Sequence, residues 1–304
     1  MNVPEVLGDW QVRQRLGAGG SAQVHLATHC RTGMAAVVKV MRPALDEEGV
    51  GDLKERMRRE AGVLASCHDP RLPRLIDINE QDGLLYLVMQ RVEGSPLSDR
   101  LRLRPLSEVQ VWRMASDLCQ ALQVAAARGV HHRDIKPANI MWNAHQSVLI
   151  DWGIATAEGW EGLTDTRIVV GTMPYLAPET LFGSADEIPA TARDVFALGV
   201  VCAEALTGKL PFSGGGGVEE KSRMQAVELP EGACSPALRN LIRRCTEAEP
   251  RARPGLDELE RIVEAGLRPP PPSIPAWLLF LVCIGCSLPP FAIALLAQFS
   301  AGNT

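Results

Sequence analysis

The chain carries His-His-Arg-Asp-Ile-Lys-Pro-Ala-Asn at residues 131–139, followed by Val-Leu-Ile-Asp-Trp-Gly at residues 148–153. Together these segments bring an acid, a lysine, an amide and a second acid within eighteen residues of sequence. Any one of these residues alone is most simply explained as a solvated loop residue. The complete set, in this order, is instead typical of a site that handles phosphate and a divalent cation.

Each polar residue of these segments has a chemical use. The carboxylate of Asp134 can accept the proton of a substrate hydroxyl. Lys136 can neutralise the charge on a phosphate in transfer. Asn139 and Asp151 supply the hard oxygen ligands that Mg²⁺ prefers, with Mn²⁺ as the alternative ion.

A glycine-rich stretch near the N-terminus is the second signal. Residues 16–24 read Leu-Gly-Ala-Gly-Gly-Ser-Ala-Gln-Val. Glycines in a turn between strands let backbone N–H groups approach phosphates closely. Alone this signal is weak, because a glycine-rich hairpin is often only a hairpin.

Lys39 strengthens the interpretation of that stretch as a phosphate-binding loop. It ends the apolar sequence Ala-Val-Val-Lys at residues 36–39. A lysine in such a strand is usually a surface residue, but Glu60 gives it a reason to point inward. Glu60 falls on the apolar face of a helical pattern between about residues 52 and 66, where an unpaired carboxylate is costly. A Lys39–Glu60 pair would hold the lysine toward ATP phosphates. The alternative is that Glu60 leans into solvent.

From about Trp10 to Val263 these motifs resemble, in the correct order, those of the eukaryotic-type (Hanks-type) protein kinases, and most closely the membrane-anchored serine/threonine kinases of bacteria. The resemblance implies an α+β bilobal fold, with a small strand-rich N-lobe carrying one main helix and a larger helical C-lobe. It implies an ATP- and Mg²⁺-dependent enzyme that phosphorylates serine and threonine hydroxyls of protein substrates in bacterial signalling. Autophosphorylation, in trans within a dimer, is compatible with this class.

The resemblance also implies a nucleotide site. Met89 looks like the residue that guards the adenine pocket, and the backbones of Gln90 and Val92 would bond the adenine. The complete set of implied ATP-binding residues is Leu16, Gly17, Ala18, Gly19, Gly20, Val24, Ala36, Lys39, Met89, Gln90 and Val92.

Further roles follow from the same resemblance. Asp134 would be the catalytic base, and Asp194 would brace the loop that carries it. Glu179, in Ala177-Pro178-Glu179, would close the activation segment and pair with Arg253. The implied catalytic residues are Asp134, Lys136, Lys39 and Glu60; the metal ligands are Asn139 and Asp151; the structural residues are Arg133, Glu179, Asp194 and Arg253.

The activation segment contains three threonines of interest. Lys136 and Thr172 look like the serine/threonine type of kinase, and Thr172 is expected to bond near the catalytic base. Thr166 and Thr164, in that order, are candidate autophosphorylation sites, because a phosphate there could pair with Arg133 and order the segment. The alternative is that both are ordinary polar loop residues.

Three positions depart from the kinase pattern. Ala22 replaces the third glycine of the loop, which would be costly if its backbone needs a positive φ. Trp152 replaces phenylalanine and brings an N–H that needs a partner. Gln90 replaces a glutamate, a mild change because the backbone does the bonding.

Hydrophobic patterns agree with two lobes. Segments 75–80 and 84–89 flank an Asp-Gly turn and predict a hairpin. A helix is expected over 107–129, opened by a Ser-x-x-Gln capping box, and a buried helix over 195–206 that ends at a glycine. The seam between the lobes is expected near residues 91–95.

The C-terminal region changes character. Residues 277–299 contain no charged residue, and about 23 residues of helix span about 34 Å, the thickness of a bilayer core. A buried core helix or an apolar disordered tail is the alternative. Arg261 and Arg268 on its N-terminal side predict a single-pass membrane protein with a cytoplasmic kinase domain. The expected organisation is an N-terminal extension (1–9), a kinase domain (10–265, with lobes 10–92 and 93–265), a proline-rich linker (266–275), a transmembrane helix (276–299) and a short extracytoplasmic tail (300–304).

Net charge and cysteine spacing limit the partners and the cellular setting that can be expected. The 304 residues carry a net charge of −5, so no nucleic-acid partner is expected. The eight cysteines show neither metal-site spacing nor a disulfide framework, which favours a reduced cytosolic setting.

Two other functions remain open at this point. A pseudokinase would bind nucleotide without turnover, but such chains usually lose the equivalents of Lys39, Asp134 or Asp151. A small-molecule phosphotransferase of related fold would generally lack the Ala177-Pro178-Glu179 segment.

Overall fold

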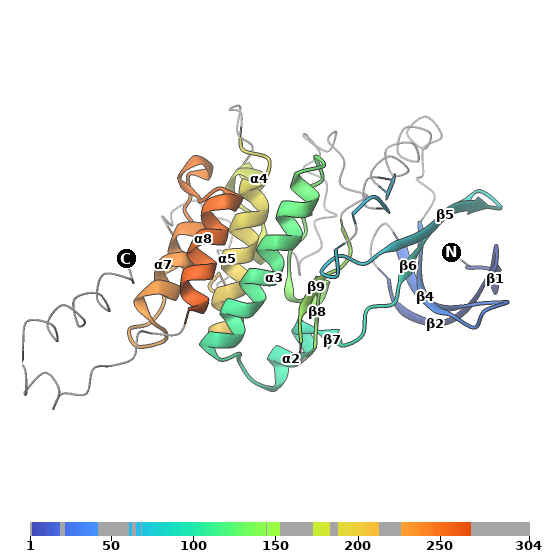
Figure 1. Cartoon of the computed structure of the whole chain (residues 1–304), viewed down its shortest axis with the longest axis horizontal. Helices are drawn as coiled ribbons and strands as arrows, with labels where there is room; N and C mark the ends of the chain where they lie inside the picture. Colours follow the sequence, from blue (N-terminus) through green and yellow to red (C-terminus); the bar gives the residue numbers. More distant parts are fainter. Residues whose placement is uncertain are drawn as a thin grey trace, which may run out of the picture. The chain divides into compact units, whose positions relative to one another are not determined.

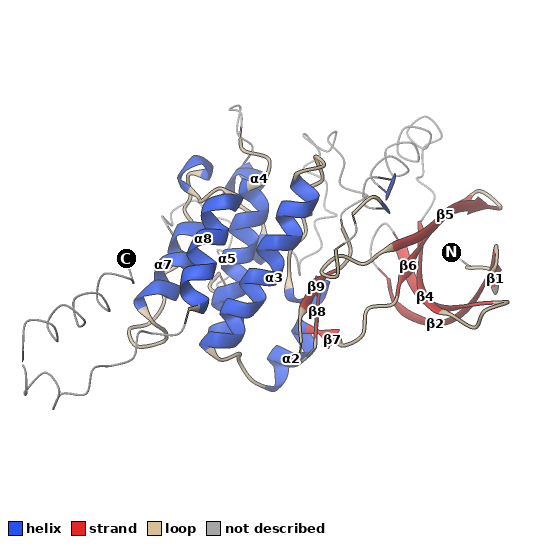
Figure 2. Cartoon of the chain, viewed as in Figure 1, coloured by secondary structure: helices blue, strands red, loops and turns tan. Residues whose placement is uncertain are grey.

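A computed structural model of the chain shows a strand-rich part up to Gln90 and a mainly helical part after it (Figures 1 and 2). The chain divides into two units, residues 1–267 and 268–304, and only Arg268 of the second is described. The structure describes residues 2–18, 22–41, 61–62, 65–67, 69–143, 145–152, 173–182, 188–212 and 226–268.

Six antiparallel strands form the N-terminal sheet in the order β1-β2-β3-β4-β6-β5. The first of them lies in the segment expected to be an extension, where Leu7 is fully buried and pairs with Trp10. The sheet therefore begins before residue 10. Its strands are β1 (Val6–Leu7), β2 (Trp10–Ala18), β3 (Ala22–His29), β4 (Ala35–Met41), β5 (Leu75–Gln81) and β6 (Leu84–Gln90).

The predicted hairpin of β5 and β6 is confirmed. Gln81 and Leu84 are register partners, so a two-residue turn joins the strands. Asp82 and Gly83 both have positive φ, at 52° and 79°, as the favoured hairpin turn requires.

The two faces of the sheet bury different groups. One face packs a sheet cluster of Leu7, Trp10, Ala27, Ala36, Val38, Val40, Tyr86 and Val88. On the other face, Met41, Leu85 and Leu87 join the main core, which continues into the helices. Because side chains alternate along a strand, each residue of β4 belongs to one face or the other.

The connection between the two parts of the fold runs through residues 91–94, where the seam was expected. Gly94 has a φ of 126°, and a Cβ there would lie 2.5 Å from the carbonyl oxygen of Trp142. After it, β7 (Ser95–Pro96) pairs with β8 (Ile140–Trp142), which pairs with β9 (Ser147–Leu149). In the chain, β8 and β9 lie between the segment 131–139 and the segment that begins at residue 150.

The expected helix starts and stops are present. Helix α3 (Glu108–Ala126) begins at a complete capping box formed by Ser107 and Gln110. Helix α5 (Ala192–Thr207) is buried along most of its length and ends at Gly208, whose φ is 70°. The remaining helices are α2 (Leu97–Leu103), η1 (Pro137–Asn139), η2 (Met173–Tyr175), α4 (Pro178–Phe182), α7 (Pro236–Cys245), η3 (Pro250–Ala252) and α8 (Leu256–Leu267).

Helix α8 continues to Leu267, past the boundary expected at residue 265. Its last turn packs on α3, since a Cβ at Gly266 would lie 2.6 Å from the ring of Trp112. A cut at residue 265 would therefore remove packed residues. Within the part of the chain that the structure describes, no helix is long and apolar enough to cross a bilayer, and the span expected at 276–299 lies outside that part.

Candidate active site

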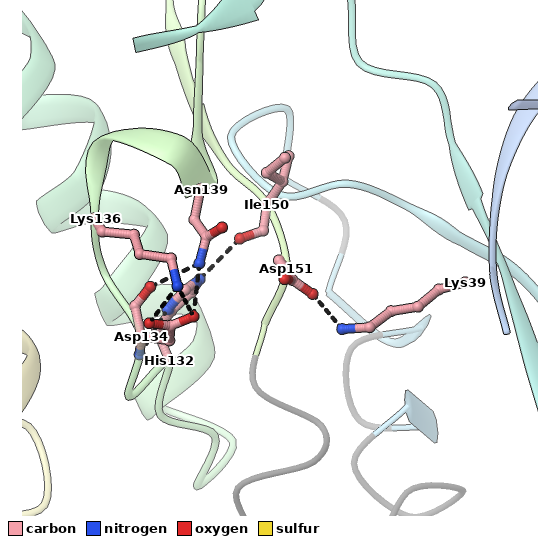
Figure 3. Close-up of polar contacts among 7 residues, drawn as sticks. All are labelled: Lys39, His132, Asp134, Lys136, Asn139, Ile150 and Asp151. Atoms are coloured by element: carbon pink, nitrogen blue, oxygen red, sulfur yellow. Dashed lines mark hydrogen bonds and ion pairs between the residues drawn. The ribbon is translucent and has the colours of Figure 1, made fainter. Parts of the chain in front are cut away.

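The carboxylate of Asp134 is the centre of a hydrogen-bonded group between α3 and β8 (Figure 3). Lys136 Nζ lies 3.0 Å from Oδ1 and 2.8 Å from Oδ2. Asn139 Nδ2 donates to Oδ2 at 3.0 Å and to the backbone carbonyl of Asp134 at 2.8 Å. A carboxylate has about four acceptor positions, and these contacts use three. Oδ1 therefore keeps capacity for the hydrogen of a hydroxyl group.

Asp194, near the start of α5, fixes the backbone of this loop. Its Oδ2 accepts the N–H of His132 at 2.8 Å, and its Oδ1 accepts the N–H of Arg133 at 2.7 Å. Arg133 has a φ of 63°, an unfavourable conformation for a residue with a side chain. The bracing that the resemblance implied for Asp194 is thus present, and it holds the strained residue immediately before Asp134.

His132 is buried and connects the loop that carries Asp134 to the segment that carries Asp151. Its Nε2 donates to the carbonyl of Ile150 at 2.9 Å, and its Nδ1 accepts the N–H of Asp134 at 3.2 Å. This pattern requires the neutral ring with its proton on Nε2. Burial lowers the pKa of His132 below its usual value, so the ring stays neutral. The role of His132 was not foreseen from the sequence.

Asp151 meets Lys39 across the site. The ammonium of Lys39 forms an ion pair and hydrogen bond with Asp151 Oδ1 (Figure 3). Burial alone would raise the pKa of Asp151, but the charge and hydrogen bond of Lys39, with smaller contributions from neighbouring groups such as Lys136, hold that pKa below its usual value. Asp151 also has a positive φ, 61°, and such strain is concentrated at functional sites.

Trp152 has the partner that its N–H needs. The indole Nε1 donates to the carbonyl of Leu149 at 2.8 Å. The ring packs edge-on against His132 with ring centroids 4.9 Å apart. Tryptophan is therefore accommodated directly beside Asp151.

The position of Ala36 corrects the expected nucleotide site. Ala36 is fully buried in the sheet cluster, on the face of β4 opposite Lys39. Strand alternation places Val37 on the face of Lys39, and Val37 is the register partner of Met89. Val37, half-buried, is thus the β4 residue beside Met89 on the side of the site. Counting two residues back from Lys39 would have found it.

The other nucleotide contacts are described in part. Leu16 is 54 % exposed although it is large and apolar, as a residue that covers a ligand would be. Ala22 is a buried strand residue and is not among the described residues with positive φ, so the expected cost of alanine there does not arise. The N–H of Gln90 donates to the carbonyl of Arg74 at 2.8 Å, which leaves only its carbonyl for a nucleotide. Val92 lies half-buried in the connecting segment.

Arg253 and Glu179 form the buried ion pair that the resemblance implied. The two guanidinium NH₂ groups donate to the two carboxylate oxygens at 2.7 and 2.9 Å. The remaining three donors reach the carbonyls of Glu247, Ala192 and Ala248 at 2.8–3.1 Å. All five N–H groups of the guanidinium are used, which makes this a fully satisfied buried charge.

The oxygens near Asp151 fit a divalent cation. Since Asn139 Nδ2 faces Asp134, its carbonyl oxygen points away from that residue, on the side of Asp151 (Figure 3). One carboxylate, one amide oxygen and substrate phosphates are the usual ligands of Mg²⁺. Among the described residues no group of three or more acidic, histidine or cysteine side chains forms a separate metal site.

Several expected residues lie outside the described part of the chain. The expected Lys39–Glu60 pair therefore stays a prediction, as do the roles of the activation-segment threonines. These residues are Gly19, Gly20, Glu60, Thr164, Thr166 and Thr172.

This fold and site define a protein kinase domain: the family model of that description matches residues 10–262, and the chain belongs to that family. Among its bacterial relatives is serine/threonine-protein kinase PknB of Mycobacterium tuberculosis, 37 % identical over 223 residues, which cover 70 % of this chain and 35 % of PknB. Serine/threonine-protein kinase PknH of Mycobacterium bovis is 36 % identical over 69 % of this chain and 35 % of its own length. PrkC of Bacillus subtilis is 30 % identical over 81 % and 38 %. The match thus spans little more than a third of these curated relatives.

Proposed function

We propose that the chain is a protein-serine/threonine kinase that transfers the γ-phosphate of ATP to protein hydroxyls in bacterial signalling. The arrangement of Asp134 supports this most: its carboxylate is fixed by Lys136 and Asn139, and its backbone is tied through Asp194 to α5. A module that only binds nucleotide would not need this arrangement. The relatives named above are called serine/threonine-protein kinases and match about 70–80 % of this chain, which supports the proposal.

In this mechanism, the substrate hydroxyl gives its proton to Asp134 as its oxygen bonds the γ-phosphorus. The bond from that phosphorus to the β–γ bridging oxygen breaks, and ADP leaves. Lys136, beside Asp134, neutralises charge on the phosphate in transfer, and Lys39 contacts the α- and β-phosphates. A divalent cation held by Asn139 and Asp151 would supply positive charge to the β- and γ-phosphate oxygens.

Radiolabelled ATP with Mg²⁺ and a generic protein substrate tests the proposal. Asp134→Asn should lose roughly 10²–10⁴-fold in transfer while it still binds a fluorescent ATP analogue, because Asp134 faces the hydroxyl. Asp99→Asn, an exposed aspartate of α2, is the matched control and should keep full activity. Nucleotide binding without any labelling of substrate or chain would favour the pseudokinase alternative.

Phosphorylation of Thr166 or Thr164 is the regulation that we propose for this site. The backbone of Arg133 is held next to Asp134, and its guanidinium is the cation that we expect a phosphate on that segment to pair with. Mass spectrometry before and after phosphatase treatment, with activity measured on both samples, tests it. An unmodified segment in fully active enzyme would contradict it.

The uncharged run 277–299 supports a further proposal, a single membrane span that leaves the kinase domain in the cytoplasm. Full-length protein should sediment with membranes and resist extraction by alkaline carbonate. Protein truncated after Arg268, beyond the end of α8, should be soluble and active. Full-length protein in the soluble fraction would refute the span.

A further inference from the structure

We propose that the corner between α2 and α3 docks the kinase domain onto a bilayer of anionic lipids. The inference rests on the membrane span proposed above and adds the surface that faces the bilayer. Seven large apolar side chains are exposed among the described residues, and three lie at this corner or beside it. They are Leu103 (82 % exposed), Val109 (56 %) and Leu267 (38 %).

Packing brings these residues together. Leu103 ends α2 and Val109 lies in the first turn of α3, with only residues 104–107 between the helices. Trp112, less than one turn further along α3, is the residue on which Gly266 packs. Leu267 follows Gly266 at the end of α8, which runs beside α3 (Figure 1).

The same corner is positively charged. Arg104, Arg113 and Lys209 are all exposed. Lys209 lies near the corner because Gly208, the residue before it, packs against Pro105: a Cβ at Gly208 would lie 3.0 Å from Pro105 Cγ. Within the described part of the chain, none of these three cations has an acidic partner. The whole chain has a net charge of −5, so the cluster is a local feature.

Most acidic residues near the corner are already paired or hydrogen-bonded within the domain. Asp99 pairs with Arg102 at 3.1 Å. The Glu108 carboxylate accepts hydrogen bonds from the Ser235 backbone at 3.0 Å and from the Trp112 indole at 3.2 Å, which turns it into the domain. Glu264 on α8 stays exposed and reduces the local excess of positive charge.

The length of the linker explains why a lipid surface is the occupant. Only seven residues, 269–275, separate Arg268 from the proposed span at 276–299, and seven extended residues reach at most about 25 Å. The proposed span would therefore keep the end of α8 near the bilayer surface. The effective concentration of lipid headgroups around the corner would be high, so that even a surface with weak affinity for lipid would be bound. Cations are attracted to anionic lipids, and an apolar side chain such as Leu103 can enter the headgroup region.

Amide hydrogen exchange of the full-length chain in nanodiscs tests the docking. We compare discs of phosphatidylcholine with discs that also contain phosphatidylglycerol, and we expect amides of residues 103–110 to exchange at least roughly fivefold more slowly in the anionic discs. Raising the salt concentration should abolish the difference. The double variant Leu103→Glu with Arg104→Glu should lose the protection. The control Met34→Glu with Arg31→Glu, at exposed positions of the turn between β3 and β4, should keep it.

The outcomes separate the two proposals. A chain that does not incorporate into either disc refutes the span itself. Incorporation without protection of residues 103–110 leaves the span intact and overturns the docking. Equal protection in neutral and anionic discs, or protection in detergent without a bilayer, also overturns it.

Discussion

The ammonium of Lys39 on β4 is paired with the carboxylate of Asp151, 112 residues later in the chain. This contact joins the six-stranded sheet to the segment that follows the small sheet. It also helps to keep the pKa of Asp151 below its usual value, because the charge and hydrogen bond of Lys39 are the main effects that oppose burial.

Lys39→Met should therefore damage the site in two ways. Phosphotransfer should fall by roughly 10²-fold or more, since a phosphate contact is lost. Without its countercharge, burial should raise the pKa of Asp151, so that the acid limb of kcat/KM against pH moves to higher pH. Arg31→Met, which removes an exposed cation, is the control. An acid limb unchanged in Lys39→Met would mean that Asp151 does not depend on the lysine.

Trp152→Phe should retain activity within roughly tenfold but lower stability. The variant loses the hydrogen bond to the Leu149 carbonyl and leaves that buried acceptor without its donor, a cost of about 1–3 kcal/mol. Thermal unfolding and steady-state kinetics on the same preparation measure both effects. An inactive but folded variant would show that the indole is needed to place Asp151.

Arg253→Met should lower the free energy of unfolding by about 3–5 kcal/mol, because it leaves the buried carboxylate of Glu179 without its partner. Adding Glu179→Leu should recover part of this loss by removing the orphaned charge. Arg251→Met, two residues away and exposed, should change little. Denaturant unfolding measures all three, and a single variant as stable as the control would contradict the assignment.

His132 should make stability depend on pH. Its folded-state pKa lies below 6.5, so the unfolded state takes up the proton first as the pH falls. Stability is thus full above about pH 6.5 and is lost below it, by up to about 1.4 kcal/mol per pH unit for one group. The pKa of His25 is lowered by burial too, and it adds to the same slope.

Unfolding measured between about pH 7.5 and 5.5 tests this assignment. The slope should decrease in His132→Gln, even though that variant is less stable throughout. His145→Gln, at an exposed position, should keep the slope of the original chain. Parallel slopes in all three proteins would exclude His132 as a source of the dependence.

The sequence alone determined the features that depend on local chemistry. The Asp-Gly turn, the capping box at Ser107 and the glycine stop at Gly208 each act over a few residues, so composition and spacing were enough. The order of the chemical motifs identified the kinase class, and with it the Glu179–Arg253 pair, although its residues lie 74 positions apart.

Only the tertiary structure decided contacts that depend on which face of an element is buried. Alternation along the strand puts Val37 on the face of Lys39, but only the register of β4 with β6 decides that Val37 lies beside Met89. The two hydrogen bonds of His132 exist because the loop and the segment before Asp151 meet around one buried ring. The packing of Gly266 on Trp112 carries α8 past the expected boundary. Such contacts arise from long-range packing, in which residues distant in sequence compete for the same buried space.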